Sequence, residues 1–445
     1  YFIYYHASLL PSIRHFIQFS CFYFVYYAQF SFCWIYVKIK VVANVFSFYC
    51  ILFYFVQFRK EIYIAMKILD RYIDQLLEKS SPSRPIWNIE KIRQGAKPSW
   101  NYMDGCMINA ILELYHITQK EEYLDFADRF IDYFVEEDGS IHSYDPKEHN
   151  LDNVNTGKTL FDLYDLTGKE KYRLAIDLVY SQLKTQPRTS TGNFWHKEIY
   201  PNQIWLDGLY MAQPFYMQYE VTYNNSTNCK DCYQQFVNVY NLMRDLRNGL
   251  YYHAYDDSRT SFWCDKVTGL SDNFWLRALG WYAMALIDTM EVMPEETLGS
   301  EKKEMNRIYK ELIDSMLPYQ DEETGMWYQV VNRGGIHPNY LETSGSAIFA
   351  YAIMKSVRLG FLDGSYFAYG KKAFEGICRT YLSEENGELQ LGGICLVAGL
   401  GNKEMREGTF DYYMREPIVK NEAKGVAPLI LAYIELMYQH QEAEV

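Results

Sequence analysis

The sequence lacks the basic surplus that a nucleic-acid-binding protein needs. Its 445 residues carry 43 Lys and Arg against 56 Asp and Glu, which gives a formal net charge of -13. Without excess cations to neutralise phosphates, we expect no nucleic-acid partner. The length is sufficient for one large domain or two ordinary ones.

Cysteine is too scattered for a disulfide framework, and its nine copies cannot pair completely. Cys229 and Cys232 form a single C-x-x-C motif, without the second pair or nearby His that would favour zinc binding. We interpret them as reduced loop thiols without a special role. Reduced cysteines are typical of a cytoplasmic protein, and this is the location that we expect.

Residues 1–60 contain no glycine, aspartate or glutamate. Apolar stretches from Phe16 to Ile35 and from Val41 to Phe58 are long enough to span a membrane, but they are rich in Tyr and Ser. Neither has the layout of a signal peptide. We interpret residues 1–65 as a non-domain extension translated from upstream of a native start at Met66. A membrane anchor, with a membrane or exported location, is the alternative. A chain beginning at Met66 should therefore be soluble and active.

No run of alternating strands is long enough for a central sheet, and from Met66 onward apolar residues follow the helical period instead. This periodicity and the turn residues between segments predict twelve helices. They cover approximately residues 66–79, 103–118, 121–136, 152–166, 169–185, 206–223, 231–247, 275–292, 301–317, 343–358, 365–382 and 422–440.

The connections between these helices are of two kinds. Short polar turns such as 118–120 and 167–169 join antiparallel neighbours. Long loops in a compact domain are usually functional, and here they would all open at one end. We therefore predict an all-α fold, an (α/α)6 barrel of six helical hairpins over residues 66–445. A generic helical bundle would not need the long aromatic loops at 137–151, 190–205, 248–274, 323–342 and 386–421.

One carboxylate, Asp207, lies in an apolar wall formed by Trp205 and Leu206 at the start of a predicted helix. Burial favours the protonated form of a carboxyl group, which allows it to act as a general acid near neutral pH. Asp207 also fits a simple helix cap. We expect burial and a second carboxylate, Asp152, to raise the pKa of Asp207 by more than the helix dipole lowers it.

Other polar and aromatic residues fall near the same predicted end of the barrel. Taken one at a time, each has a simpler interpretation as a helix cap, a polar loop residue, core packing or a solvated charge. Together, two acids, a His, an Arg and several aromatic rings suit the binding of an anionic sugar and the transfer of one proton. These residues are Asp152, Asp207, Trp205, His253, Trp275, Arg277 and Trp281, followed by the segment 408–425.

Five motifs together resemble the unsaturated glucuronyl and rhamnogalacturonyl hydrolases of glycoside hydrolase family 105. They are W-L-D-G-L-Y-M at 205–211, H-A-Y-D at 253–256, W-x-R-x-x-G-W at 275–281, E-T-S-G-S-A at 342–347 and the segment from D-Y-Y at 411–413 to K-G-V at 424–426. The resemblance extends from Met66 to the C-terminus. It implies an (α/α)6 barrel that acts on oligosaccharides and needs no metal or organic cofactor.

The resemblance also implies a reaction. A general acid protonates C4 of a 4,5-unsaturated uronic acid, water adds at C5, and the hemiketal collapses to release the aglycone. Asp207 matches the proton donor and Asp152 the second active-site aspartate. Substrate-site positions match His253, Trp275, Arg277 and Trp281. The planar cation of Arg277 suits a uronate carboxylate, and Trp205 and Trp281 would offer ring faces to the sugar.

Two other classes of protein fit the same residues. The first class is another enzyme with the same fold, either an inverting glycosidase or a polysaccharide lyase. An inverting glycosidase requires two carboxylates spaced to admit a water molecule, which Asp152 and Asp207 could supply. The second class is a carbohydrate-binding toroid without activity. We favour the hydrolase that removes unsaturated galacturonate from a rhamnogalacturonan-derived oligosaccharide, as in pectin degradation.

Overall fold

The computed structural model describes residues 67–444, so the extension expected at residues 1–65 lies outside the described residues. The chain divides into Tyr1–Leu69 and Asp70–Val445, and the second unit carries the fold and the site described below. Within residues 67–444, no helix has an apolar stretch long enough to cross a membrane.

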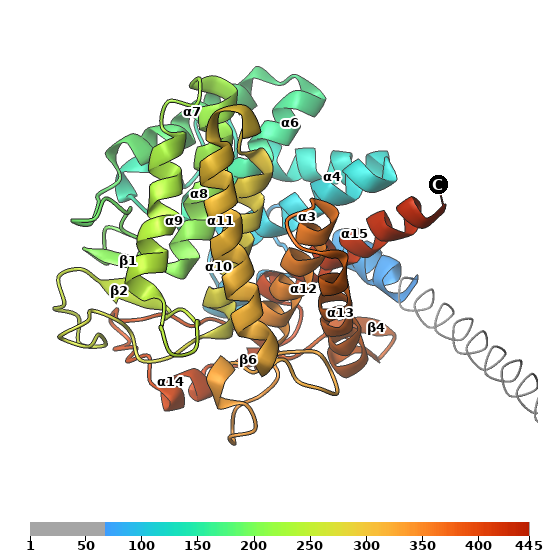
Figure 1. Cartoon of the computed structure of the whole chain (residues 1–445). Coiled ribbons are helices and arrows are strands. Elements are labelled where there is room, and N and C mark those ends of the chain that lie inside the picture. The colour runs from blue at the N-terminus through green and yellow to red at the C-terminus, as the bar shows by residue number, and fades with distance from the viewer. Residues whose placement is uncertain (1–66, 445) are drawn as a thin grey trace, which may run out of the picture. The chain divides into compact units, whose positions relative to one another are not determined.

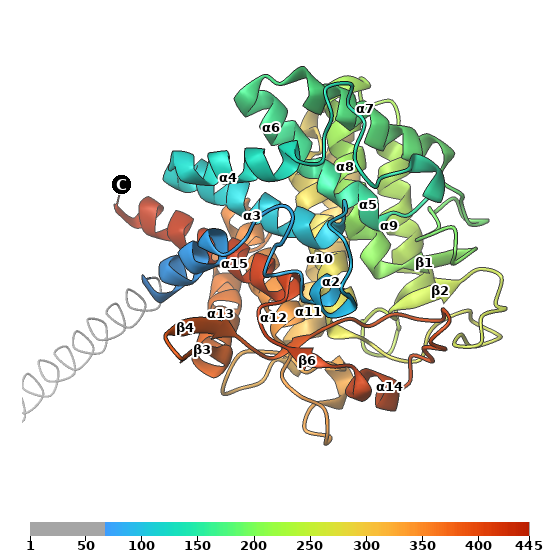
Figure 2. The same ribbon diagram turned by 180° about the vertical axis from the view of Figure 1, so that it is seen from behind.

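Six helical segments pack in a closed inner ring, in which each contacts the next and the last contacts the first (Figures 1 and 2). In order of contact they are α3 (Tyr102–Thr118), α15 (Ala423–Glu444), α12 (Thr343–Arg358), α10 (Leu276–Val292), α8 (Leu206–Tyr223) and the broken helix made of α5 (Asp152–Asn155), the 3-10 turn η2 (Thr156–Lys158) and α6 (Thr159–Thr167).

An outer helix accompanies each inner segment. The pairing of six outer with six inner segments confirms the predicted (α/α)6 barrel. The first outer helix is residues 70–78, which contact α15 through a 2.8 Å hydrogen bond from Tyr433 Oη to Asp70 Oδ1. The other outer helices are α4 (Glu121–Asp132), α7 (Glu170–Thr185), α9 (Cys229–Met243), α11 (Glu295–Met316) and α13 (Phe367–Tyr381).

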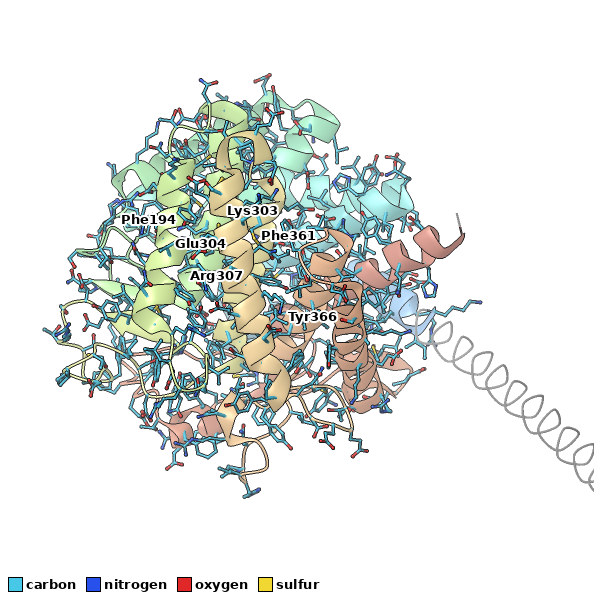
Figure 3. All side chains as sticks on the ribbon, in the orientation of Figure 1. Phe194, Lys303, Glu304, Arg307, Phe361 and Tyr366 are labelled. Carbon is cyan, nitrogen blue, oxygen red and sulfur yellow. The ribbon has the colours of Figure 1, made fainter. Side chains whose placement is uncertain are left out.

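The outer helices are amphipathic, as α11 illustrates. Its outward side carries Lys303, Glu304 and Arg307, which Figure 3 shows on the surface of this helix. Ile308 and Leu312 are fully buried on its other side. Apolar residues at a spacing of four thus form the stripe that holds an outer helix on the ring.

Short elements connect the hairpins. Strands β1 (Gln203–Trp205) and β2 (Ala254–Asp256) pair antiparallel, as do β3 (Leu382–Glu385) with β4 (Glu388–Leu391) and β5 (Ile394–Cys395) with β6 (Ile418–Val419). Two short helices, α2 (Ile89–Gln94) and α14 (Phe410–Arg415), were not expected from the sequence. In both views β2, β6 and α14 lie at the lower end of the ring.

Two sequence-based expectations were wrong in detail. The helix predicted at 152–166 is interrupted by η2, where a Cβ on Gly157 would lie 2.9 Å from the Phe215 ring, so the backbone packs closely against α8. Cys229 and Cys232 are not loop thiols, because both lie in the first turn of α9 and are fully buried. Both are free cysteines, as expected.

Candidate active site

A two-stranded ladder brings Asp207 next to His253. Trp205 in β1 pairs with Ala254 in β2, and the Leu206 amide donates a 3.1 Å hydrogen bond to the His253 carbonyl. The helix α8 begins at Leu206, so Asp207 lies in its first turn. A pairing between segments some fifty residues apart therefore determines which side chain faces Asp207.

His253 is fully buried and contacts a different residue through each ring nitrogen. Its Nδ1 shares a 2.8 Å hydrogen bond with the Tyr413 hydroxyl, and its Nε2 lies 3.3 Å from Asp207 Oδ2. The second pair of atoms does not have hydrogen-bond alignment, and both atoms are buried without a partner among the described residues. The contact is therefore close and electrostatic.

The expected rise in the pKa of Asp207 was wrong. Burial does favour its protonated form, but the proximity and charge of His253, with a smaller effect from His196, lower its pKa below the ordinary value. The predicted rise in pKa considered only the apolar wall and the second carboxylate. The two imidazoles were left out because neither is adjacent to Asp207 in the chain.

Asp152 begins α5 and lies between two nitrogen-bearing side chains. Lys197 Nζ approaches Asp152 Oδ2 at 2.5 Å, and His196 Nε2 lies 3.6 Å from Oδ1. Backbone pairing positions all three residues, because Asn150 forms an antiparallel bridge with Lys197 and the Leu151 amide donates to the His196 carbonyl at 3.1 Å.

The aromatic residues of the site are packed against one another. Trp205 is 5% exposed and stacks on His196 and Tyr200, with ring centroids 4.8 and 5.0 Å apart. Trp281 is 2% exposed and stacks on Tyr210 at 4.8 Å. The expectation that both rings offer open faces to a sugar is corrected, since the structure places them in the aromatic wall.

Trp275 and Arg277 form a second side of the site at the start of α10. Trp275 lies 4.7 Å from the His253 ring, and the Arg277 guanidinium carbon is 4.8 Å from the Trp275 ring. Arg277 is 1% exposed, and its Nη1 donates to Ser344 Oγ at 3.1 Å and to the Cys395 carbonyl at 2.6 Å. Both acceptors are neutral.

Polar residues recur at the second position of the inner helices. Asp207, Arg277, Ser344 and Lys424 are the second residues of α8, α10, α12 and α15 respectively. Lys424 is buried and pairs with Glu90 at 3.0 Å and with Glu422 at 2.8 Å. Four inner helices thus place a polar or charged side chain at the same end of the ring.

Most of the candidate residues predicted from the sequence lie together in the structure, but several of their contact partners were not predicted. Asp152, Asp207, His253, Trp275 and Arg277 converge as expected. The sequence analysis missed His196, Lys197 and Glu90, and it included Tyr413 and Lys424 in motifs without giving either a role. His196 and Lys197 fall inside a predicted long loop, which was the available signal. Within residues 67–444, no group of three or more His, Cys, Asp or Glu side chains could hold a metal ion.

Comparison with known proteins agrees with this fold. The model of Glycosyl Hydrolase Family 88 matches residues 77–439. A solved family 105 glycoside hydrolase from Clostridium acetobutylicum is 40% identical, with a TM-score of 0.77, and the match covers 83% of this chain and 98% of that one. Protein Atu3128 of Agrobacterium fabrum is 39% identical over 51% of this chain and 97% of its own length. The unsaturated rhamnogalacturonyl hydrolase YesR of Bacillus subtilis is 26% identical over 65% of this chain and 78% of its own.

The ring of hairpins and the matched relatives define the protein as an (α/α)6 glycoside hydrolase. The chain belongs to the family 88 and family 105 group of unsaturated uronyl hydrolases, as its motifs predicted.

Proposed function

We propose that the protein removes the 4,5-unsaturated uronic acid from the non-reducing end of lyase-generated oligosaccharides, with unsaturated galacturonyl-rhamnose as its preferred substrate. The observation that carries this proposal is the environment of Asp207, a carboxyl in the first turn of α8 that faces His253 at 3.3 Å. The 26% identity with an unsaturated rhamnogalacturonyl hydrolase supports the choice of aglycone.

Asp207 is the proton donor in this proposal. Its side chain is 14% exposed, so it can reach a bound sugar, whereas His253 behind it is fully buried. Protonation of C4 gives an oxocarbenium-like cation, water adds at C5 and returns a proton to the Asp207 carboxylate, and the resulting hemiketal opens to release the aglycone. No covalent bond to a carboxylate is needed, in contrast to retaining glycosidases.

The lowered pKa of Asp207 in the free protein sets a requirement on the complex. An acid that is ionised near neutral pH must gain a proton before it can donate one. A bound uronate brings a negative charge and excludes water, and both effects raise the pKa of a neighbouring carboxyl group. The substrate itself therefore promotes the protonated form of Asp207.

Asp152 fits a supporting role better than that of a general base. An inverting glycosidase needs a second carboxylate free to activate water. Asp152 instead contacts Lys197 at 2.5 Å and lies 3.6 Å from His196 Nε2. With Oδ2 held by the Lys197 ammonium, Asp152 is less free to bind and activate a water molecule, which disfavours the inverting alternative.

An ultraviolet assay tests the proposal. The unsaturated uronide absorbs in the ultraviolet, so its hydrolysis is followed as a loss of absorbance from unsaturated galacturonyl-rhamnose, with unsaturated glucuronyl disaccharides as the comparison. We expect the faster loss with the galacturonyl substrate. A gain of absorbance on intact polysaccharide would identify a lyase, and unchanged absorbance with every substrate would identify a binding protein. A loss restricted to glucuronyl substrates would overturn the proposed aglycone.

A further inference from the structure

A water-sized hollow lies beside Gly208, the residue after Asp207, and residues of both α8 and α9 line it. Its volume is about 10 Å³, close to the minimum of about 10–15 Å³ that one water molecule needs. The polar residues and the glycine in its wall are Asn193, His196, Gly208, Gln213 and Gln235. The hollow therefore touches the residue that follows Asp207 and an imidazole that faces Asp152.

His196 spans the distance between this hollow and Asp152. Its ring is 3% exposed, and its Nε2 lies 3.6 Å from Asp152 Oδ1. Its other nitrogen, Nδ1, packs against Gly208, where an added Cβ would lie only 3.0 Å away. Glycine at 208 thus permits the imidazole to approach the backbone next to Asp207.

Two residues that line the hollow each have one buried polar atom without a hydrogen-bond partner among the described residues. The atoms are His196 Nδ1 and Gln213 Oε1. The rest of the wall is already paired, since Gln213 Nε2 donates to Gln235 Oε1 at 3.1 Å and Asn193 Nδ2 donates to the Gln235 carbonyl at 2.9 Å. A buried polar atom without a hydrogen bond is costly, and two such atoms beside a water-sized hollow need a donor for each.

We propose that one buried water molecule donates hydrogen bonds to Gln213 Oε1 and His196 Nδ1, and so holds His196 as the neutral tautomer whose proton is on Nε2 and directed at Asp152. Gln213 is then a positioning residue that acts through this water and His196. Asp152 then faces the Nε2–H of His196 at 3.6 Å with one oxygen and the Lys197 ammonium at 2.5 Å with the other, which fixes its orientation beside Asp207.

The charged surroundings of His196 are consistent with a neutral ring. Burial, together with Lys197 and His253, opposes its protonation and outweighs the opposite effect of Asp152 and Asp207, which lowers the pKa of His196 to about 4. A neutral imidazole carries its proton on one nitrogen only, and the hydrogen bond that the other nitrogen accepts determines which tautomer is present.

The tautomer can be read directly in long-range proton–nitrogen NMR spectra of the full-length protein with nitrogen-15 in its histidines. His196→Gln identifies the His196 signals. We expect wild-type His196 to carry its proton on Nε2 at pH 7. A proton on Nδ1, or on both nitrogens, would overturn the proposal without reference to any substrate.

Gln213→Leu removes the water's acceptor and does not touch the substrate. Because the effect on turnover rests on the proposed function, it is measured with the hydrolysis assay. We expect a mixture of His196 tautomers and a five- to tenfold lower kcat, with KM within about twofold, as loss of one hydrogen-bonded positioning contact implies. Gln182→Leu is the matched control, because Gln182 is a fully buried glutamine whose side chain bonds to Tyr144 and Gln186 instead.

The two variants separate positioning from general destabilisation. The control should lose similar thermal stability and keep wild-type kcat. Unchanged tautomer and kcat in Gln213→Leu, or an equal kcat loss in Gln182→Leu, would overturn the proposal. If Gln213→Leu fails to fold, the tautomer of His196 measured in the wild-type protein still tests the proposal. If wild-type protein shows the Nε2 proton but hydrolyses no unsaturated uronide, the proposed function fails and the water-held tautomer stands.

Discussion

Helices α10 and α12 lie side by side, and their two ends carry buried charge in opposite ways. At the first turns, Arg277 of α10 donates to the hydroxyl of Ser344 in α12 and to a backbone carbonyl. At the last turns, Lys355 of α12 pairs with Asp288 and Glu291 of α10 at 2.8 and 2.7 Å. One end has a cation with neutral partners, and the other has a cation between two carboxylates.

This difference distinguishes a structural charge from one that is available to a ligand. Burial of an ion is costly unless an opposite charge compensates it. Lys355 has that compensation within the protein. Among the described residues, no carboxylate lies within ion-pair distance of Arg277, although Glu342 and Glu422 are near enough to favour its charged form. Arg277 therefore has no direct carboxylate partner, and a uronate carboxylate is a ligand that could fill that position, in agreement with the proposed substrate.

The largest effect should come from Asp207→Asn at the site end. An amide has the size of the acid but cannot donate a proton to carbon, so we expect kcat to fall by about a thousandfold, within the usual range for a lost general acid. Unfolding temperature and substrate binding should change little. Asp288→Asn is the matched change at the other end of the ring, and it should keep kcat while lowering the unfolding temperature. Wild-type kcat in Asp207→Asn would remove this residue from catalysis.

The fold was predictable because helical periodicity and loop length are local properties. The helix predicted at 343–358 is α12, Thr343–Arg358, where Glu342 caps the first turn by accepting from the Ser344 and Gly345 amides. The interruption at Thr156–Lys158 was not predictable, since it depends on how closely α8 approaches Gly157. Short strands such as β5, with two residues, have no period that a sequence could reveal.

The proximity of the candidate residues was predictable from the sequence, whereas their electrostatics were not. Asp207 and Arg277 follow tryptophans at helix starts, which is a pattern along the chain. The pKa of Asp207 depends on His253 and His196, which reach it through the β1–β2 ladder and a loop bridge. Such pairings join distant segments, so neighbouring residues in the sequence suggested the opposite direction for this pKa.

The next largest effect should be Lys355→Met at the opposite end of the ring. Removal of this cation leaves Asp288 and Glu291 close together without compensation, and loss of one partner of a buried ion pair costs about 3–5 kcal/mol. We expect the free energy of unfolding in urea to fall by about 3 kcal/mol. The kcat and KM of the variant, measured at 20 °C where it is still folded, should equal the wild-type values. A tenfold change in KM would contradict the assignment of this end as structural.

Arg277→Lys should have a smaller effect, and it should mainly weaken substrate binding. Lysine keeps the charge but lacks the planar fork that binds a carboxylate through two parallel hydrogen bonds. We expect KM to rise about tenfold, equivalent to about 1.4 kcal/mol, with a smaller change in kcat. Arg358→Lys is a control, because Arg358 makes a two-bond contact to Glu435 away from the site. Equal KM values for Arg277→Lys and wild type would exclude Arg277 from the uronate site.

The smallest effects should be opposite shifts, in two variants, of the alkaline limb of the pH profile of kcat/KM. Activity requires protonated Asp207, so this limb moves with the pKa of Asp207. His253→Gln removes the imidazole that lowers this pKa, and the limb should move to higher pH by about one unit. Asp152→Asn removes a negative neighbour that favours protonation, and the limb should move to lower pH by about half a unit, because Lys197 already compensates part of that charge. Profiles measured on both variants and on wild type check the signs. Movement of both limbs in the same direction would show that His253 and Asp152 do not act on Asp207 as opposite charges.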